Sequence, residues 1–225
     1  MLFKLKKTII SLMVSLSNPW LLLLHTSLIL PFTIMLDPAG NGKNIGRSLH
    51  DNFERGATLQ FAQELQKQLK IYYPQVNVII SRSSGQKLEK LQSASFANRL
   101  NVDLFLNLGF YKEHNVKPNL FLYQFKNQSF FANHNQDFLH FYPYHQAFVF
   151  NYDKTKHIIG LMQKHLQHPD YKHYFTCHQS LEIPFKPLSG IISPAIGIEI
   201  GLKHNGYEPY IMPIIHSLAE VIYEL

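Results

Sequence analysis

Apolar residues recur along the chain with two different spacings, and these spacings predict alternating strands and helices. Short apolar runs bounded by turn residues are typical of buried strands, whereas apolar residues three to four positions apart indicate amphipathic helices. On this basis we expect strands at 32–36, 75–81, 103–108, 119–125 and 194–200. We expect helices at 55–72, 86–101 and 211–222.

Strands that alternate with helices predict an α/β fold of three layers, α/β/α, in which helices cover both faces of a mainly parallel sheet. In such sheets, ligands and catalytic groups gather at the carboxyl ends of the strands. The residues of interest are therefore those from Asp37 onward, those after Leu108, and Glu199.

The first 30 residues have the pattern of a targeting segment. Three lysines occur in the first seven residues, and residues 8–36 contain no Asp, Glu, Lys or Arg. A basic start followed by an apolar stretch is typical of a signal peptide, or of an anchor, which needs roughly 20 apolar residues to span a membrane. We expect residues 1–30 to export the chain to the periplasm or cell envelope, or to anchor it in the membrane facing that compartment.

Residues 121–152 fit the alternation of strands and helices poorly. Twelve of these 32 residues are Phe or Tyr. We expect an inserted hairpin or loop that packs its own aromatic cluster. The alternative is a lip over a cleft, whose rings stack on a sugar or a lipid.

The composition excludes several classes of protein. Apolar residues make up 46% of the chain, as in a folded domain and unlike a disordered one. The net charge of +6 falls to about +3 without the three N-terminal lysines, so we expect no nucleic-acid partner. A single cysteine, Cys177, excludes an internal disulfide framework and a cysteine-based zinc site. Thirteen histidines make metal chemistry worth testing.

Polar motifs follow the predicted strands in a distinctive order. They are Asp37-Pro38-Ala39-Gly40-Asn41-Gly42, then Glu54 at the first helix, Ser81-Arg82, Ala97-Asn98 with Asp103-Leu104-Phe105, and finally Pro194-Ala195 with Glu199, Gly201 and Asn205. In this order and spacing, the chain from about Thr33 onward resembles the zinc-dependent N-acetylmuramoyl-L-alanine amidases that cut peptidoglycan. The resemblance implies an amidase-like domain over residues 31–225 and a peptidoglycan or muropeptide partner.

Two positions of the metal site that the resemblance implies hold glycine. Members of the family bind zinc through two histidines and a glutamate and leave a position open for water, while a second glutamate acts as general acid/base. Gly40 and Gly109 stand where the histidines are expected. Glu54 keeps the position of the glutamate ligand, and Glu199 keeps that of the catalytic general acid/base. Because catalytic zinc needs about three protein ligands, we expect a degenerate site, and zinc is doubtful as a cofactor here.

Other residues offer alternatives to this interpretation. His50, His114 and His204 could replace the missing ligands if two of them converged on Glu54. Glu54 itself could simply be an acidic residue that the helix dipole stabilises. Glu199 interrupts an apolar strand, where a buried carboxylate is costly, so we expect it to face a cleft.

The remaining candidates have weaker patterns. His157, His165 and His168 fall on an expected helix, where we expect solvated or capping roles rather than a metal site. Cys177 has His178 beside it, but a Cys–His nucleophile also needs a third group that orients the base. We therefore expect no cysteine-based catalysis.

The sequence leaves three functions open. The leading one is a peptidoglycan-binding or regulatory pseudoenzyme of the cell envelope whose zinc site has decayed. The second is an active amidase that hydrolyses the bond between N-acetylmuramic acid and L-alanine with substitute metal ligands. The third is an anchored structural protein that uses its aromatic insertion for protein contacts.

Overall fold

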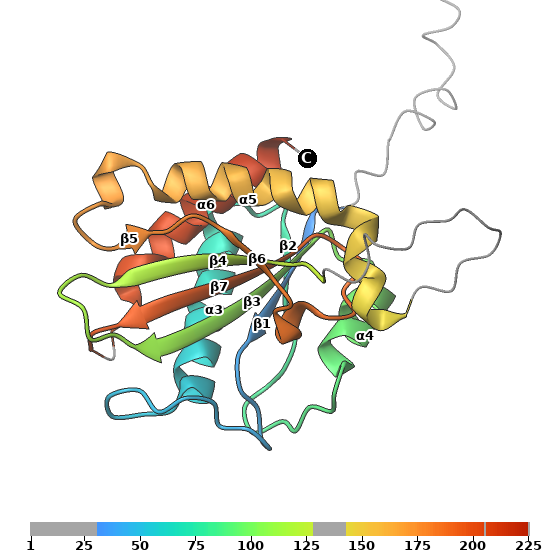
Figure 1. The fold of residues 1–225 in the computed structure, drawn as a ribbon, viewed down its shortest axis with the longest axis horizontal. Coiled ribbons are helices and arrows are strands. Elements are labelled where there is room, and N and C mark those ends of the chain that lie inside the picture. The colour runs from blue at the N-terminus through green and yellow to red at the C-terminus, as the bar shows by residue number, and fades with distance from the viewer. Residues whose placement is uncertain (1–30, 128–142, 205, 225) are drawn as a thin grey trace, which may run out of the picture. The chain divides into compact units, whose positions relative to one another are not determined.

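A computed structural model describes residues 31–127, 143–204 and 206–224, so the expected signal peptide or anchor at 1–30 lies outside the described residues (Figure 1). Its centre is a seven-stranded sheet in the order β2-β1-β3-β7-β4-β5, with β6 also paired to β4. The strands are β1 (Thr33–Pro38), β2 (Asn77–Ile80), β3 (Leu104–Lys112), β4 (Asn119–Phe125), β5 (Thr176–Cys177), β6 (Leu181–Ile183) and β7 (Ala195–Leu202). Among the described residues, no helix is long and apolar enough to cross a membrane.

The predicted α/β fold with a mainly parallel sheet is confirmed. Strands β2, β1, β3 and β7 pair in parallel, and β4 pairs in parallel with β5 and β6. The exception is the antiparallel pairing of β4 with β7. Only residues 113–118 connect β3 to β4, which is too short for the crossover that a parallel strand requires. The β4 strand therefore reverses direction and pairs on the far side of β7.

Helices cover both faces of the sheet, as Figure 1 shows. The α-helices are α3 (Glu54–Tyr72), α4 (Gln92–Leu100), α5 (Tyr152–Leu166) and α6 (Ile211–Glu224). Short 3-10 helices are η2 (Tyr144–Asn151), η3 (Pro169–Tyr171), η4 (Lys186–Leu188) and η5 (Glu208–Tyr210). Helices α3, α5 and α6 share one large core with the sheet. Helix α4 and η2 pack with a smaller core on the opposite face.

Alternation along the central strands determines which core each side chain joins. In β1, Ile34 and Leu36 belong to the large core, whereas Met35 between them belongs to the small one. In β3, Leu104 and Leu106 face the large core and Phe105 faces the small one. Successive side chains of a strand point to opposite faces, so both faces of these strands are buried. This explains why they appear in the sequence as continuous apolar runs.

Helix α4 begins six residues later than the expected start at residue 86. Its preceding residue, Leu91, has φ 63°, in the left-handed region, and Gly85 has φ 71°. These conformations hold residues 86–91 as a loop rather than as a turn of helix. Asn101 ends the helix, also in the left-handed conformation, with its N–H donating to the carbonyl oxygens of Ala97 and Asn98.

The aromatic stretch at 121–152 is divided among several elements. Residues 121–125 lie within β4, and residues 144–151 form η2, which continues into α5. Phe125 and Phe148 pack together in the small core, with ring centroids 5.2 Å apart. Residues 128–142 lie outside the described residues. The inserted hairpin or loop expected over them therefore stays a prediction.

Candidate functional site

A cleft of about 360 Å³ opens at the carboxyl ends of β1, β3 and β7. The four positions that the sequence identified, Gly40, Glu54, Gly109 and Glu199, all line it. The strand register accounts for part of this grouping, because Gly109 on β3 pairs directly with Glu199 on β7. The cleft also contains Arg47, which the sequence analysis did not single out.

Glu54 is the first residue of α3, and its carboxylate is surrounded by hydrogen-bond donors. Oε1 accepts from the backbone N–H of Phe110 at 3.0 Å and from Arg47 Nη2 at 2.7 Å. Oε2 accepts from the backbone N–H and from Nε of Arg47, at 2.9 and 3.1 Å. Each oxygen thus accepts two hydrogen bonds in a residue that is only 3% exposed. An acid stabilised by the helix dipole alone would not need these four hydrogen bonds, so that alternative does not describe the surroundings of Glu54.

Gly46 makes this close approach possible. It has φ 74°, in the region that favours glycine, and a Cβ there would lie 2.8 Å from Glu54 Oε2. The chain is then held by hydrogen bonds between Glu54 N–H and the Arg47 carbonyl, at 2.9 Å, and between Arg55 N–H and the Ile45 carbonyl, at 3.1 Å. These backbone hydrogen bonds hold the Arg47 backbone in place independently of its side-chain contacts.

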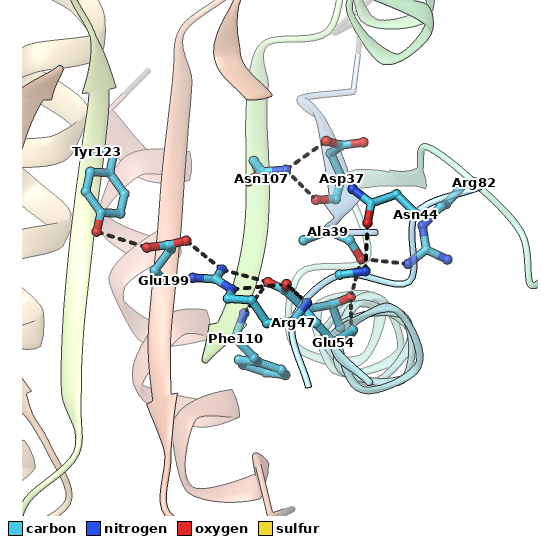
Figure 2. A network of polar contacts seen from close by, with 12 residues as sticks. Asp37, Ala39, Asn44, Arg47, Glu54, Arg82, Asn107, Phe110, Tyr123 and Glu199 are labelled. Atoms are coloured by element: carbon cyan, nitrogen blue, oxygen red, sulfur yellow. Dashed lines mark hydrogen bonds and ion pairs between the residues drawn. The ribbon is translucent and has the colours of Figure 1, made fainter. Parts of the chain in front are cut away.

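Arg47 bridges the two glutamates of the cleft (Figure 2). Its Nη2 donates to Glu54 Oε1 at 2.7 Å and to Glu199 Oε1 at 2.6 Å. Burial acts to lower the pKa of Arg47, but hydrogen bonds to Glu54 and Glu199 outweigh it and raise the pKa above its usual range. The guanidinium carbon also lies 6.0 Å from the centre of the Tyr111 ring, a distance typical of a cation–π contact.

Glu199 extends from β7 into the cleft, and its side chain is 16% exposed. Its second oxygen, Oε2, accepts a hydrogen bond from the Tyr123 hydroxyl at 3.0 Å. Burial and the negative charge of Glu199 raise the pKa of Tyr123, so this hydroxyl stays protonated and remains a donor. The Tyr123 ring is in turn stacked on Phe185, with centroids 4.7 Å apart.

Asp37 forms a separate buried cluster at the end of β1. Its oxygens accept from the Ser81 hydroxyl at 2.5 Å and from Asn107 Nδ2 at 2.9 Å. Burial raises the pKa of Asp37, while these hydrogen bonds and the charge of Arg82 act in the opposite direction. Arg82 donates to the carbonyl oxygens of Pro38, Ala39 and Arg55. It therefore holds the end of β1 against the first turn of α3.

The residues that line the cleft do not fit a zinc ion. Glu54 has both oxygens occupied by donors, and Gly40 and Gly109 offer no ligand atoms. A Cβ at Gly109 would lie 3.1 Å from Arg47 Nη2, and one at Gly40, whose φ is 75°, would lie 2.9 Å from the Arg55 Cβ. Within residues 31–127, 143–204 and 206–224, no group of three or more His, Cys, Asp or Glu side chains could hold a metal ion.

The three substitute histidines do not converge on Glu54, and none of them lines the cleft in the part of the chain that the structure describes. His50 Nε2 lies 3.0 Å from the Leu202 carbonyl oxygen, and its ring is 6.2 Å from that of His204. His114 uses its backbone N–H to bind the side chain of Glu113. The idea that these histidines rescue a metal site through Glu54 is therefore wrong for this arrangement.

The other candidates have structural partners. His157 and His165 lie beside Glu224 and Glu220 of α6, at 3.1 and 3.4 Å. His168 precedes η3, and its side chain accepts from the backbone N–H of Asp170, in the capping role that was expected. Burial raises the pKa of Cys177 to about 12, which disfavours the thiolate that a nucleophile requires.

Sequence reasoning missed Arg47, which lines the cleft, and Tyr123, whose hydroxyl donates to Glu199 from β4. One signal was present: Glu54 and Glu199 are kept while the two expected histidines are replaced by glycine, and two acidic side chains without a metal ion need another cation. Arg47 follows Gly46 in the loop just before Glu54. Neither spacing nor periodicity indicates that its side chain turns back onto α3 and then reaches β7.

Comparison with known proteins shows what this arrangement is similar to. A family model described as N-acetylmuramoyl-L-alanine amidase matches residues 34–209. The amidase CwlM of Bacillus licheniformis is 35% identical over 75 residues, which are 33% of this chain and only 30% of that protein.

Solved structures reproduce the fold. The amidase Ami1 of Mycobacterium smegmatis superposes with a TM-score of 0.64 at 14% identity, over 86% of this chain and 98% of that one. An amidase of Clostridium difficile 630 gives 0.62 at 17% identity, over 87% and 96% of the two chains. The catalytic domain of CwlV from Bacillus (Paenibacillus) polymyxa gives 0.59 at 16% identity, over 85% and 96%.

Proposed function

Since the chain belongs to the N-acetylmuramoyl-L-alanine amidase family, we propose that it is a protein of the cell envelope that binds peptidoglycan without hydrolysing it. The observation that carries this proposal is the position of Arg47. Its guanidinium lies between Glu54 and Glu199, beside Gly109, where the family resemblance implies a metal ion.

A guanidinium group cannot perform the chemistry of a catalytic zinc ion. Zinc accepts a lone pair from water, lowers the pKa of that water to about 7, and polarises the scissile carbonyl. Arginine has only N–H donors and no acceptor, so it can bind a carbonyl oxygen but cannot generate a hydroxide. Glu199 can still orient a water molecule, as a general base does. Arg47, however, is not a Lewis acid, so it cannot make the attack of that water on an amide fast.

Several observations support the proposal that the cleft still binds peptidoglycan. The cleft keeps a volume within the range of about 300–1,000 Å³ that is typical of small-ligand sites. Its polar groups are held in place on several elements, and the similar proteins CwlM and CwlV are named N-acetylmuramoyl-L-alanine amidases. The basic and apolar pattern of residues 1–30 supports a place in the envelope, either exported or anchored.

Two assays on the full chain test the proposal together. Sedimentation with purified peptidoglycan measures binding, and release of stem peptides from the same material measures hydrolysis, with added zinc and with a chelator. We expect co-sedimentation at physiological salt, no release above a blank, and no stoichiometric zinc in the purified protein.

Two outcomes separate this proposal from its alternatives. Release of stem peptides that Glu199→Gln abolishes identifies an active amidase and overturns the proposal. Absence of sedimentation favours the structural protein that contacts other proteins. The exposed substitution Glu208→Gln, outside the cleft lining, is the matched control for Glu199→Gln.

A further inference from the structure

Arg47 and Glu199 present a donor and an acceptor side by side at the surface of the cleft. Nε and Nη2 of Arg47 are engaged with the two glutamates. No hydrogen bond from Nη1 to another residue is found within the described part of the chain, and 43% of the Arg47 side chain is exposed. Each oxygen of Glu199 accepts one hydrogen bond from the protein, so each keeps capacity for another.

Neighbouring residues hold this pair in place from both sides. Glu54 fixes Arg47 through three hydrogen bonds, and the backbone N–H of Phe110 fixes Glu54. On the other side, the Tyr123 hydroxyl fixes Glu199. A pair that is already ordered loses little conformational entropy when a ligand binds, which favours affinity.

The charges of the pair select the kind of ligand. Arg47 carries one positive charge, and Glu54 and Glu199 carry two negative charges, so the cluster has a formal net charge of −1. A carboxylate or phosphate at Nη1 would meet the charge of Glu199 at close range, and an ammonium ion at Glu199 would meet that of Arg47. A neutral group that offers both an acceptor and a donor avoids both conflicts.

An extended peptide residue offers such a group. Its own N–H and C=O point to the same edge of the chain, which is why paired antiparallel strands exchange two hydrogen bonds residue by residue. The N–H and C=O of a single trans amide, such as an acetamido group on a sugar, point in opposite directions. A donor and an acceptor on one surface therefore match a peptide residue better than an acetamido group.

We infer that Arg47 and Glu199 bind one residue of an extended peptide, with Arg47 Nη1 donating to its carbonyl oxygen and Glu199 accepting from its N–H. The inference rests on the proposed function, because it names the chemical group that the same cleft recognises in peptidoglycan. The residue is an alanine joined to N-acetylmuramic acid, and the amide bond stays intact.

Two small probes test the inference with the unaltered full chain. One is N-acetylmuramoyl-L-alanine N-methylamide, and the other is its ester analogue, in which an oxygen replaces the alanine N–H while the carbonyl is kept. We expect calorimetry to show binding of the ester about tenfold weaker, because Glu199 is left facing an ester oxygen instead of a donor. The alanine amide should be recovered intact by mass spectrometry.

Two variants identify the residues. Glu199→Gln should reduce the ratio of amide to ester affinity from about ten towards one, because an uncharged amide, which carries a donor as well as an acceptor, replaces the carboxylate. Arg47→Lys should weaken both probes by a similar factor of about ten, because both keep the carbonyl. The exposed substitutions Glu208→Gln and Arg99→Lys, which leave the cleft lining unchanged, are the matched controls. Circular dichroism checks that each variant is folded.

The outcomes distinguish failure of the inference from failure of the proposed function. Equal affinity of the unaltered chain for amide and ester overturns the inference, as does equal competition by an N-acetylglucosamine oligosaccharide. If the protein sediments with peptidoglycan but does not bind the alanine amide, the inference is overturned and the proposed function still holds. If neither peptidoglycan nor the alanine amide binds, the proposed function fails.

Discussion

Arg47 and Glu54 are joined by three hydrogen bonds from one residue to a single buried carboxylate, at 2.7, 2.9 and 3.1 Å. The backbone N–H and Nε of Arg47 share one oxygen of Glu54, and Nη2 takes the other. Because the carboxylate is buried, these donors replace the hydrogen bonds to water that it lost on folding. The Arg47–Glu54 pair therefore contributes to the stability of the cleft as well as to its chemistry.

Replacing Arg47 by methionine should destabilise the protein by about 1–3 kcal/mol. Breaking a buried ion pair by removing one partner costs about 3–5 kcal/mol, and the partial exposure of the Arg47 side chain reduces this figure. Urea unfolding measures the change. Arg99→Met, on the exposed side of α4, should stay within about 0.5 kcal/mol. A loss at Arg47 no larger than at Arg99 would contradict the structural role of the pair.

Restoring a histidine at Gly109 should not restore zinc binding by itself. A side chain at this position meets Arg47 Nη2, and Glu54 stays occupied by Arg47. Gly109→His combined with Arg47→Ala should bind stoichiometric zinc, because histidine, Glu54 and Glu199 then supply three ligands. Zinc titration followed by metal analysis measures this. Gly109→Ala with Arg47→Ala is the control.

Zinc binding by Gly109→His alone, with the same affinity as the double variant, would show that Arg47 does not block the site. Gly40→His is a poorer choice, because its φ of 75° disfavours any side chain. We therefore expect Gly40→His to lower stability by about 1–3 kcal/mol without any gain in metal affinity.

The order of the strands and helices could be predicted because it depends on local pattern. Phe61, Leu65 and Leu69 repeat at helical spacing and are fully buried in α3. The approximate position of the cleft followed from the parallel strands, since Asp37 lies at the carboxyl end of β1 and Glu199 lies in the second half of β7. These features need no knowledge of how distant side chains meet.

The chemistry of the cleft could not be predicted in the same way. The contact from Arg47 to Glu199 joins residues 152 positions apart, and it depends on the left-handed conformation of Gly46. The antiparallel placement of β4 brings Tyr123 to Glu199, whereas the sequence suggested only another strand. Such contacts depend on tertiary geometry that hydrophobic periodicity does not encode.

Glu113 should make the stability of the fold depend on pH in the acidic range. Its carboxylate accepts hydrogen bonds from the backbone N–H groups of His114 and Asn115, from the Tyr111 hydroxyl and from Asn119. Burial acts to raise the pKa of Glu113, but these donors outweigh it and lower the pKa to about 2. A lowered pKa means that the stabilisation is present at neutral pH and is lost as the pH falls from about 4.5 towards 2.

The variant Glu113→Gln tests this pH dependence. It should lower the free energy of unfolding by about 1–3 kcal/mol at pH 7, and the difference from the unaltered chain should shrink below about pH 4. Unfolding curves between pH 7 and pH 2 measure the difference, with the exposed Glu208→Gln as control. A deficit that stays constant down to pH 2 would assign the effect to packing rather than to charge.

Gly197 leaves the space that the ring of Phe185 fills. A Cβ at Gly197 would lie 2.7 Å from Phe185 Cε1, and Phe185 is stacked on the Tyr123 ring that orients Glu199. Gly197→Ala should therefore force the Phe185 ring away from Tyr123 and cost about 1–3 kcal/mol, as overpacking does. Thermal unfolding and the ring-proton NMR shifts of Tyr123 measure both effects.

The matched control is Gly160→Ala in α5, where no atom lies within 4 Å of the added Cβ. There, alanine should stabilise the protein by about 0.5–1 kcal/mol, because glycine weakens a helix interior. The same added methyl group is thus expected to lower the free energy of unfolding at Gly197 and to raise it at Gly160. If Gly197→Ala stabilised the protein as Gly160→Ala does, Phe185 would not be fixed over β7, and the support of Glu199 through Tyr123 would have to come from elsewhere.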